Sequence, residues 1–275
     1  MADTQLSVSR HPRRMGQTRY VYAVLSRRAK GLSIGINLNP DKICNFDCIY
    51  CQVDRTTPPE FREVDEAVLL EELESILSRA RDGALFQEPP FASIPEAGRR
   101  ISDISFAGDG EPTTYPRFRE VVASVAALKE RLGFGALKIA VLTNCTVLDR
   151  PAVKEALEIL DRSAGEIWAK LDAGTEAYYE QVCVPGGARF AKVLSNILET
   201  ARRRPVVIQS LFLRHEGSGP SPDEIRAYCA RLREILNGGG RIKLVQVYTV
   251  ARRPAVSSVA PLSDAEVDAI AEEVR

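Results

Sequence analysis

The order of strand-like and helix-like segments is the feature that most restricts the fold of this 275-residue chain. Short apolar runs alternate six times with amphipathic segments of helical period. The predicted strands cover residues 32–38, 101–107, 137–143, 166–171, 206–213 and 242–250. Helices are expected over 64–81, 116–132, 175–182, 190–203 and 222–236, and from positions 151 and 263 onward. This repetition predicts parallel strands joined by right-handed crossovers.

Such a chain forms an α/β protein, either a doubly wound sheet or an incomplete barrel. Its strands are short continuous apolar runs, as expected where helices cover a parallel sheet. Ser221–Glu224 and Ser263–Glu266 have the pattern of capping boxes, and the proline-rich segment 83–100 is expected to be a surface loop. In both architectures ligands bind at the C-terminal ends of the strands, so residues that follow strands are the candidates for function.

The overall charge is zero, because 37 basic residues balance 37 acidic ones, and this argues against a basic protein that coats nucleic acid. The balance hides a basic N-terminal stretch: residues 4–40 contain seven Arg or Lys and no Asp or Glu. From Asp41 onward there are 30 basic and 36 acidic residues. We expect residues 1–19 to form a basic, partly disordered arm on a core domain over 20–275. Arg27, Arg28 and Lys30 are expected to serve folding, the cofactor or an anionic substrate.

Neither an apolar signal sequence nor a run long enough to span a bilayer is present in the sequence. We therefore expect a cytoplasmic protein without a membrane partner. Its cysteines stand at positions 44, 48, 51, 145, 183 and 229. Three of them fall within eight residues, which in a cytosolic chain favours metal or redox chemistry over disulfides.

Cys44, Cys48 and Cys51 follow the first predicted strand with the spacing Cys-x3-Cys-x2-Cys. Three thiolates on one loop can hold three irons of a [4Fe-4S] cluster and leave the fourth iron open to a small molecule. A structural zinc site usually has four ligands in paired spacing, and the only histidines here are His11 and His215. Zinc with a distant fourth ligand remains an alternative.

This cysteine spacing, with Tyr50 before the third cysteine, resembles the radical S-adenosylmethionine (radical SAM) superfamily. The resemblance implies a partial (β/α)6 TIM-like barrel with a [4Fe-4S] cluster on the three cysteines and Tyr50 at the cofactor site. It also implies S-adenosylmethionine (SAM) as cofactor and an external one-electron donor of the flavodoxin or ferredoxin type. Such an enzyme cleaves SAM reductively and uses the 5′-deoxyadenosyl radical to abstract hydrogen from its substrate.

The second predicted strand ends in Gly108-Asp109-Gly110-Glu111. Glycines let the backbone approach a ligand closely, and a carboxylate can receive an ammonium group. A plain turn would explain these four residues equally well. By the resemblance, the segment binds the amino group of the methionine part of SAM.

Polar residues also follow the third and fourth strands. The resemblance implies that Asn144, Lys170 and Asp172 contact the cofactor or substrate, although Asn144 could cap a turn and Asp172 could begin an ordinary loop. A lysine in the mouth of a barrel is costly unless it meets an anion. Cys145, Cys183 and Cys229 have no informative spacing; Cys229 is expected in the core. His215 is expected to be a loop residue rather than a base.

Several segments are similar to the wyosine-synthase-like group of radical SAM enzymes; they are 26–28, 31–36, 44–51, 107–113, 169–173 and 245–249. The best-known members of that group modify a guanosine in tRNA, with pyruvate as a two-carbon donor, and hold a second cluster on further N-terminal cysteines. This chain has no cysteine before Cys44, so its substrate stays open. Three interpretations are open. The first is a radical SAM enzyme that acts on tRNA or another nucleotide. The second is a radical SAM enzyme that acts on a small metabolite or activates a glycyl-radical enzyme. The third is a non-catalytic metal-binding module.

Overall fold

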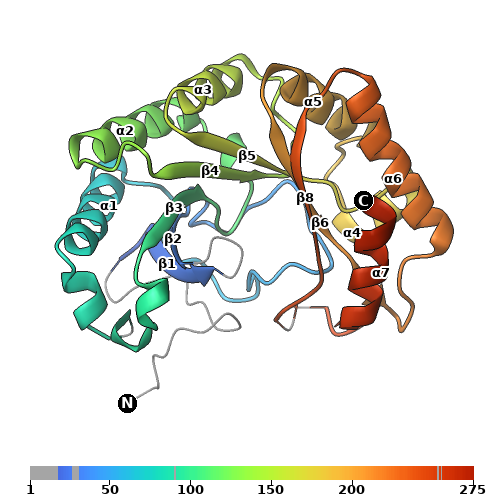
Figure 1. The fold of residues 1–275 in the computed structure, drawn as a ribbon, viewed down its shortest axis with the longest axis horizontal. Helices are drawn as coiled ribbons and strands as arrows, with labels where there is room; N and C mark the ends of the chain where they lie inside the picture. Colours follow the sequence, from blue (N-terminus) through green and yellow to red (C-terminus); the bar gives the residue numbers. More distant parts are fainter. Residues whose placement is uncertain (1–17, 27–30, 90, 253, 255) are drawn as a thin grey trace. The chain divides into compact units, whose positions relative to one another are not determined.

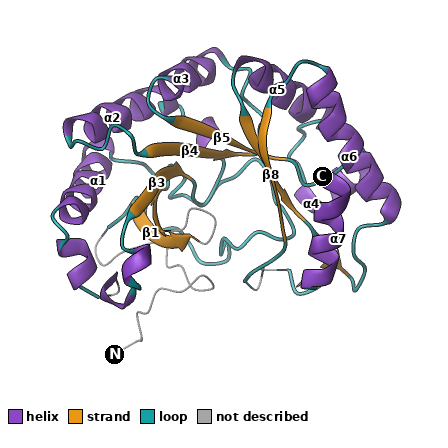
Figure 2. Ribbon diagram, viewed as in Figure 1, coloured by secondary structure: helices purple, strands orange, loops and turns teal. Residues whose placement is uncertain are grey.

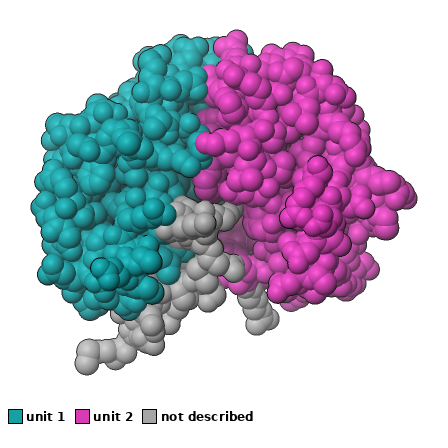
Figure 3. Space-filling model, in the orientation of Figure 1, with its two compact units in different colours: residues 1–43, 58–141, 151–166 teal, residues 44–57, 142–150, 167–275 magenta. Residues whose placement is uncertain are grey.

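The structure, a computed structural model, describes residues 18–26, 31–89, 91–252, 254 and 256–275. The chain divides into two compact units, which Figure 3 colours separately. Unit 1 holds residues 1–43, 58–141 and 151–166; unit 2 holds 44–57, 142–150 and 167–275. The basic residues of the predicted arm, and those at 27, 28 and 30, lie outside the described residues except for Arg19. The arm and the single core domain over 20–275 therefore stay predictions.

The strands of unit 1 begin with a β-hairpin pair and continue as parallel sheet. They are β1 Val21–Ser26, β2 Gly31–Ile36, β3 Ile101–Phe106 and, up to residue 141, β4 Lys138–Thr143. β1 pairs antiparallel with β2, whereas β2 with β3 and β3 with β4 are parallel. The strand predicted over residues 32–38 is confirmed as β2, although it ends at residue 36. It is not the first strand, because the apolar run at residues 21–26 forms β1.

Helices accompany these strands in unit 1 (Figure 2). They are α1 Glu66–Arg81, α2 Phe118–Arg131 and α3 Pro151–Asp161. The segment expected to be a surface loop contains three short 3-10 helices, η1 Ala84–Gln87, η2 Phe91–Ser93 and η3 Glu96–Gly98. That expectation was wrong in part, since Leu85, Phe91 and Ile94 of this segment are buried. Their burial supplies the apolar stabilisation that single turns lack.

Unit 2 contains the parallel strands β5, β6 and β8, hydrogen-bonded in that order (Figure 1). Their bounds are β5 Gly165–Lys170, β6 Val206–Leu211 and β8 Ile242–Tyr248. A small antiparallel pair, β7 Leu213–His215 and β9 Val259–Pro261, was not predicted. The helices are α4 Glu176–Cys183, α5 Phe190–Arg203, α6 Pro222–Asn237 and α7 Asp264–Val274.

One of the two predicted capping boxes is complete, and the other has a different role for its glutamate. Ser263 and Glu266 cap each other reciprocally at the start of α7. At α6, Ser221 accepts from the Glu224 backbone, but the Glu224 carboxylate is buried elsewhere. It accepts hydrogen bonds of 2.5 Å from Gly174 N and 2.6 Å from Thr175 Oγ1. Glu224 therefore fixes the β5–α4 loop, which begins at Asp172.

Together the two units supply seven strands of mostly parallel sheet. Each of β2, β3, β4, β5, β6 and β8 is followed by at least one α-helix, so the predicted α/β class with six strand–helix units is confirmed. Within the described part of the chain, no helix is both long enough and apolar enough to cross a bilayer.

Candidate functional site

The loop that carries the three motif cysteines lies in unit 2 and is held along its backbone. Cys44, Cys48 and Cys51 are partly exposed and form no disulfide, and Cys51 N donates to Cys48 O at 2.9 Å to close a turn. The loop pairs with the segment 182–186 at the end of α4. Three 3.0 Å bonds join them, from residue 49 N to 182 O, from 47 N to 184 O and from 186 N to 45 O. The sequence contained no signal for this pairing.

Cys183, the last residue of α4, brings a fourth thiol to this loop. Its side chain is hydrogen-bonded to Cys48 and is buried. This hydrogen bond, acting against burial, lowers the pKa of Cys48. The same bond and burial raise the pKa of Cys183 well above its usual range.

Asn144 holds the start of the cysteine loop from the segment after β4. Its Nδ2 donates to Asn45 Oδ1 at 2.7 Å, and Asn45 Nδ2 donates to Thr146 Oγ1 at 2.7 Å. Thr146 Oγ1 in turn donates to Asn144 Oδ1 at 2.7 Å, which closes a ring of three side chains. Asn144 also caps its own turn through Thr146 N at 3.2 Å. Asn144 thus caps a turn, which is one of the two roles considered for it, and it also holds Asn45; Asn45 and Thr146 were not predicted.

Tyr50, Lys170 and Asp172, all predicted site residues, meet in one network around the buried Asp172 carboxylate. Tyr50 OH donates to Asp172 Oδ2 at 2.6 Å, and Lys170 Nζ lies 2.9 Å from Asp172 Oδ1. Tyr248, which was not predicted, accepts from Lys170 Nζ at 2.7 Å. The Lys170 ammonium stands 5.2 Å from the centre of the Tyr50 ring and 5.0 Å from that of Tyr248. Ile49 and both tyrosines pack on an apolar cluster that excludes water, Val182, Leu211, Leu213, Val250 and Val259.

The anion that Lys170 requires is supplied by the protein. Burial alone lowers the pKa of Lys170, but the charge of Asp172 and the contact with Tyr248 outweigh it, so the pKa is raised above its ordinary value. Burial and the charge of Asp172 raise the pKa of Tyr50 well above its usual range. At neutral pH Lys170 is therefore a charged donor and Tyr50 a neutral phenol.

The Gly108–Glu111 segment lies in unit 1 and packs against the chain that leads to the cysteine loop. A Cβ on Gly108 would stand 2.2 Å from Asn37 Oδ1, and one on Gly110 would stand 2.2 Å from Ile43 O. Asn37 Nδ2 donates to Asp109 Oδ2 at 2.7 Å, and Asp109 N donates to Asn37 Oδ1 at 3.1 Å. The glycines are thus required by contacts within the protein, besides any approach to a ligand.

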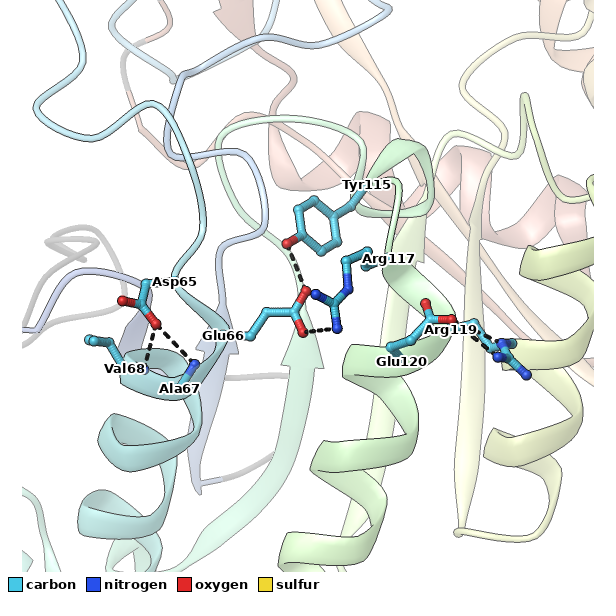
Figure 4. A network of polar contacts seen from close by, with 8 residues as sticks. All are labelled: Asp65, Glu66, Ala67, Val68, Tyr115, Arg117, Arg119 and Glu120. Atoms are coloured by element: carbon cyan, nitrogen blue, oxygen red, sulfur yellow. Dashed lines mark hydrogen bonds and ion pairs between the residues drawn. The ribbon is translucent and has the colours of Figure 1, made fainter.

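Glu111 is buried and caps the 3-10 helix η4 (Pro112–Thr114). Its carboxylate accepts from Thr113 N at 3.2 Å and from Thr113 Oγ1 at 2.5 Å. The next turn is tied to the start of α1, because Tyr115 OH donates to Glu66 at 3.0 Å and Arg117 forms a 3.2 Å ion pair with Glu66 (Figure 4). The segment after the glycines is therefore anchored at both ends.

Three further side chains have structural roles in unit 2. His215 was expected in a loop, but it lies on β7 and pairs with Val259 of β9. Its Nδ1 stands 3.0 Å from Gln181 Nε2. Cys229 is buried in α6, as predicted. Gln209 of β6 is paired with Gln246 of β8 at 2.8 Å, next to Lys170 in the strand register.

Three thiols are the number that a [4Fe-4S] cluster with one open iron requires. Among the described residues, no three His, Cys, Asp or Glu side chains converge as ligands of one metal ion would. Ligands of a [4Fe-4S] cluster bind separate irons and need not converge on one point. Three cysteines on a loop with a fixed backbone satisfy that requirement.

Comparison with known proteins follows this geometry. A sequence model of the Radical SAM superfamily matches residues 38–220. Members of that superfamily use a [4Fe-4S] cluster, SAM and an external electron donor. A UPF0026 protein of Helicobacter pylori strain 26695 is 26% identical over 245 residues, which are 89% of this chain and 70% of that protein. The UPF0026 protein of strain J99 is 30% identical over 176 residues, 64% of this chain but only 49% of that protein. This chain thus spans about half the length of the second relative.

Solved structures share the fold at low identity. TYW1 with a lysine–pyruvate adduct bound has a TM-score of 0.57 and 14% identity, over 95% of this chain and 84% of that one. Streptococcus suis SuiB bound to S-adenosylmethionine has a TM-score of 0.57 and 16% identity, over 90% of this chain and 48% of that one. These likenesses confirm the partial (β/α)6 barrel as the fold class.

Proposed function

Since this chain belongs to the radical SAM superfamily, we propose that it is an enzyme that holds a [4Fe-4S] cluster on Cys44, Cys48 and Cys51 and cleaves SAM reductively. The observation that carries the proposal is the fixed cysteine loop, paired along its backbone with residues 182–186 and bonded to Asn144. A loop held in this way presents three thiols from a preorganised backbone, which reduces the entropy cost of ligation.

The chemistry that a bound cluster supplies is one-electron reduction of SAM, which breaks the C5′–S bond to give methionine and a 5′-deoxyadenosyl radical that abstracts a hydrogen atom from the substrate. The protein contributes binding, orientation and exclusion of water. Asn45 and Asn144 orient the loop, and the apolar cluster behind Ile49 and Tyr50 keeps water from its inner side.

We assign the methionine end of SAM to the segment Gly108–Glu111. The carboxylates of Asp109 and Glu111 are acceptors of the kind that an ammonium group requires. Asn37 orients Asp109 from two sides. Asp109→Asn should weaken SAM binding at constant cluster content, measured by equilibrium dialysis; an unchanged dissociation constant would remove Asp109 from the site.

For the substrate we place tRNA or another nucleotide first. The specific support is the stretch 4–40, which holds seven basic residues and no acidic ones. Phosphate contacts from such residues make binding fall steeply with salt. RNA binding with a steep salt dependence supports this class, whereas absence of RNA binding favours a small metabolite or a glycyl-radical partner.

Anaerobic reconstitution with iron and sulfide tests the cluster assignment. The expected result is one [4Fe-4S] cluster per chain, lost when any of the three motif cysteines is replaced by alanine. Cys229→Ala is the matched control, because this buried thiol lies in α6. A chain that binds zinc in preference to the cluster would instead support a non-catalytic metal-binding module.

A further inference from the structure

We propose that Cys183 is a positioning residue for the cluster: its thiol donates a hydrogen bond to the Cys48 sulfur and raises the reduction potential of the cluster that Cys48 ligates. The inference rests on the proposed function, since it requires Cys48 to be an iron ligand. It adds a fourth cysteine to the site. Cys183 donates a hydrogen bond to the iron ligand Cys48 but does not itself bind iron.

The backbone register places the two cysteines opposite each other. The bonds from residue 49 N to 182 O and from 47 N to 184 O flank them on both sides, and Phe46 forms an antiparallel bridge with Pro185. By the same register, Cys48 faces Cys183 in a non-hydrogen-bonded pair. Such pairs bring side chains closest, with Cα atoms about 4.5 Å apart. The contact between the sulfurs therefore follows from backbone pairing and not from a chance rotamer.

The chain conformation around Cys183 is specified from both sides. Cys183 ends α4, and the cap residue Val184 has a left-handed backbone with φ of 43°. This conformation is unfavourable for a β-branched residue and persists only where the surroundings impose it. Here the turn at Val184 directs the chain back along the cysteine loop. The position of the Cys183 thiol is therefore fixed by a helix end and a backbone ladder together.

The surroundings of Cys183 suit a thiol donor. Its side chain is buried, and the adjacent Val182 belongs to the apolar cluster beneath Ile49 and Tyr50. By the register described above, the S–H group of Cys183 faces the Cys48 sulfur, and a thiolate that ligates iron can only accept a hydrogen bond. Hydrogen bonds to ligand sulfurs stabilise the more negative, reduced state of a cluster and so raise its potential. Cys183 is thus placed to ease the electron transfer that SAM cleavage requires.

Redox titration of the reconstituted protein, followed by electron paramagnetic resonance, tests this assignment. Cys183→Ala and Cys183→Val remove the donor, and valine also fills the space of the thiol. Both should shift the potential to more negative values at unchanged iron and sulfide content. Cys183→Ser keeps a donor and should stay closer to the wild type. Cys229→Ala should titrate as the wild type does.

The outcomes separate the two proposals. A wild-type chain that forms no cluster overturns the proposed function and this inference with it. A normal cluster whose potential is the same in wild type, Cys183→Ala and Cys183→Val overturns the inference alone. Loss of iron from all three Cys183 variants also overturns it, because it makes Cys183 a ligand. SAM should change the electron paramagnetic resonance signal of the cluster equally in wild type and in Cys183→Ala. This result supports the inference, because it shows that Cys183 does not occupy the iron that SAM binds.

Discussion

Tyr50 donates a 2.6 Å hydrogen bond to the carboxylate of Asp172, across 122 positions of sequence. The other oxygen of that carboxylate accepts from Leu211 N at 2.8 Å and lies 2.9 Å from Lys170 Nζ. Asp172 therefore joins the cysteine loop to the ends of β5 and β6 through one buried side chain.

Tyr50→Phe tests the first of these bonds. It leaves a buried carboxylate one donor short, so we expect a loss of about 1–3 kcal/mol in the free energy of unfolding, measured in urea. Tyr178→Phe is the control, because Tyr178 packs on the same apolar cluster and its hydroxyl has no hydrogen bond within the described residues. Equal stability of the two variants would show that the Tyr50 bond contributes nothing.

The buried ion pair of Lys170 and Asp172 can be measured by a double-mutant cycle. Lys170→Met or Asp172→Asn alone leaves an unpaired buried group and should cost about 3–5 kcal/mol. The double variant should lose less than the sum, with a coupling of about 1–3 kcal/mol. The exposed pair Lys192–Asp149 should couple by only about 0.2–1 kcal/mol. Additive effects at Lys170 and Asp172 would contradict the network.

Gly110 should not tolerate a side chain. A Cβ there would stand 2.2 Å from the backbone oxygen of Ile43, which has no flexible end to move away. Gly110→Ala should therefore lower the free energy of unfolding by about 1–3 kcal/mol or more. At Gly219 the nearest atom to an added Cβ is 3.4 Å away, so Gly219→Ala should unfold as the wild type does. Wild-type stability of Gly110→Ala would refute the close packing of this segment.

Tyr115 should make the free energy of unfolding depend on pH in the alkaline range. Burial and then its hydrogen bond to Glu66 raise the pKa of Tyr115 from 10.0 to about 12. Above pH 10 the unfolded chain loses this proton while the folded chain keeps it, so the stabilisation from Tyr115 is complete below pH 10 and is lost toward pH 12. The stability difference between wild type and Tyr115→Phe should narrow across that window. A constant difference would show that the pKa is not raised.

Local patterns in the sequence predicted most of the fold. Apolar period and capping residues located α1 to α7 within a few positions, because these signals act between neighbours in the chain. β1 was missed, since its apolar run follows the basic arm and pairs antiparallel, outside the strand–helix alternation. The 3-10 helices between α1 and β3 were missed because their stability comes from the burial of Phe91 and Ile94.

The candidate site was predicted in part for the same reason. The spacing of Cys44, Cys48 and Cys51 is local and visible, whereas the partners of the loop come from distant segments. Cys183 faces Cys48 only because residues 45–49 pair with residues 182–186. No local pattern in the sequence predicts which residues of two distant segments pair. Tyr248 lies within residues 245–249, which are similar to the wyosine-synthase-like group. That similarity was the one sequence feature that could have pointed to Tyr248 as a site residue.

Formation of 5′-deoxyadenosine and methionine from SAM, under anaerobic reducing conditions, tests the central claim most directly. The proposed function predicts both products in equal amounts from the reconstituted wild type and from Cys229→Ala, and none from Cys48→Ala. Cleavage of SAM by Cys48→Ala at the wild-type rate, or none by a wild-type chain with a full [4Fe-4S] cluster, would contradict it.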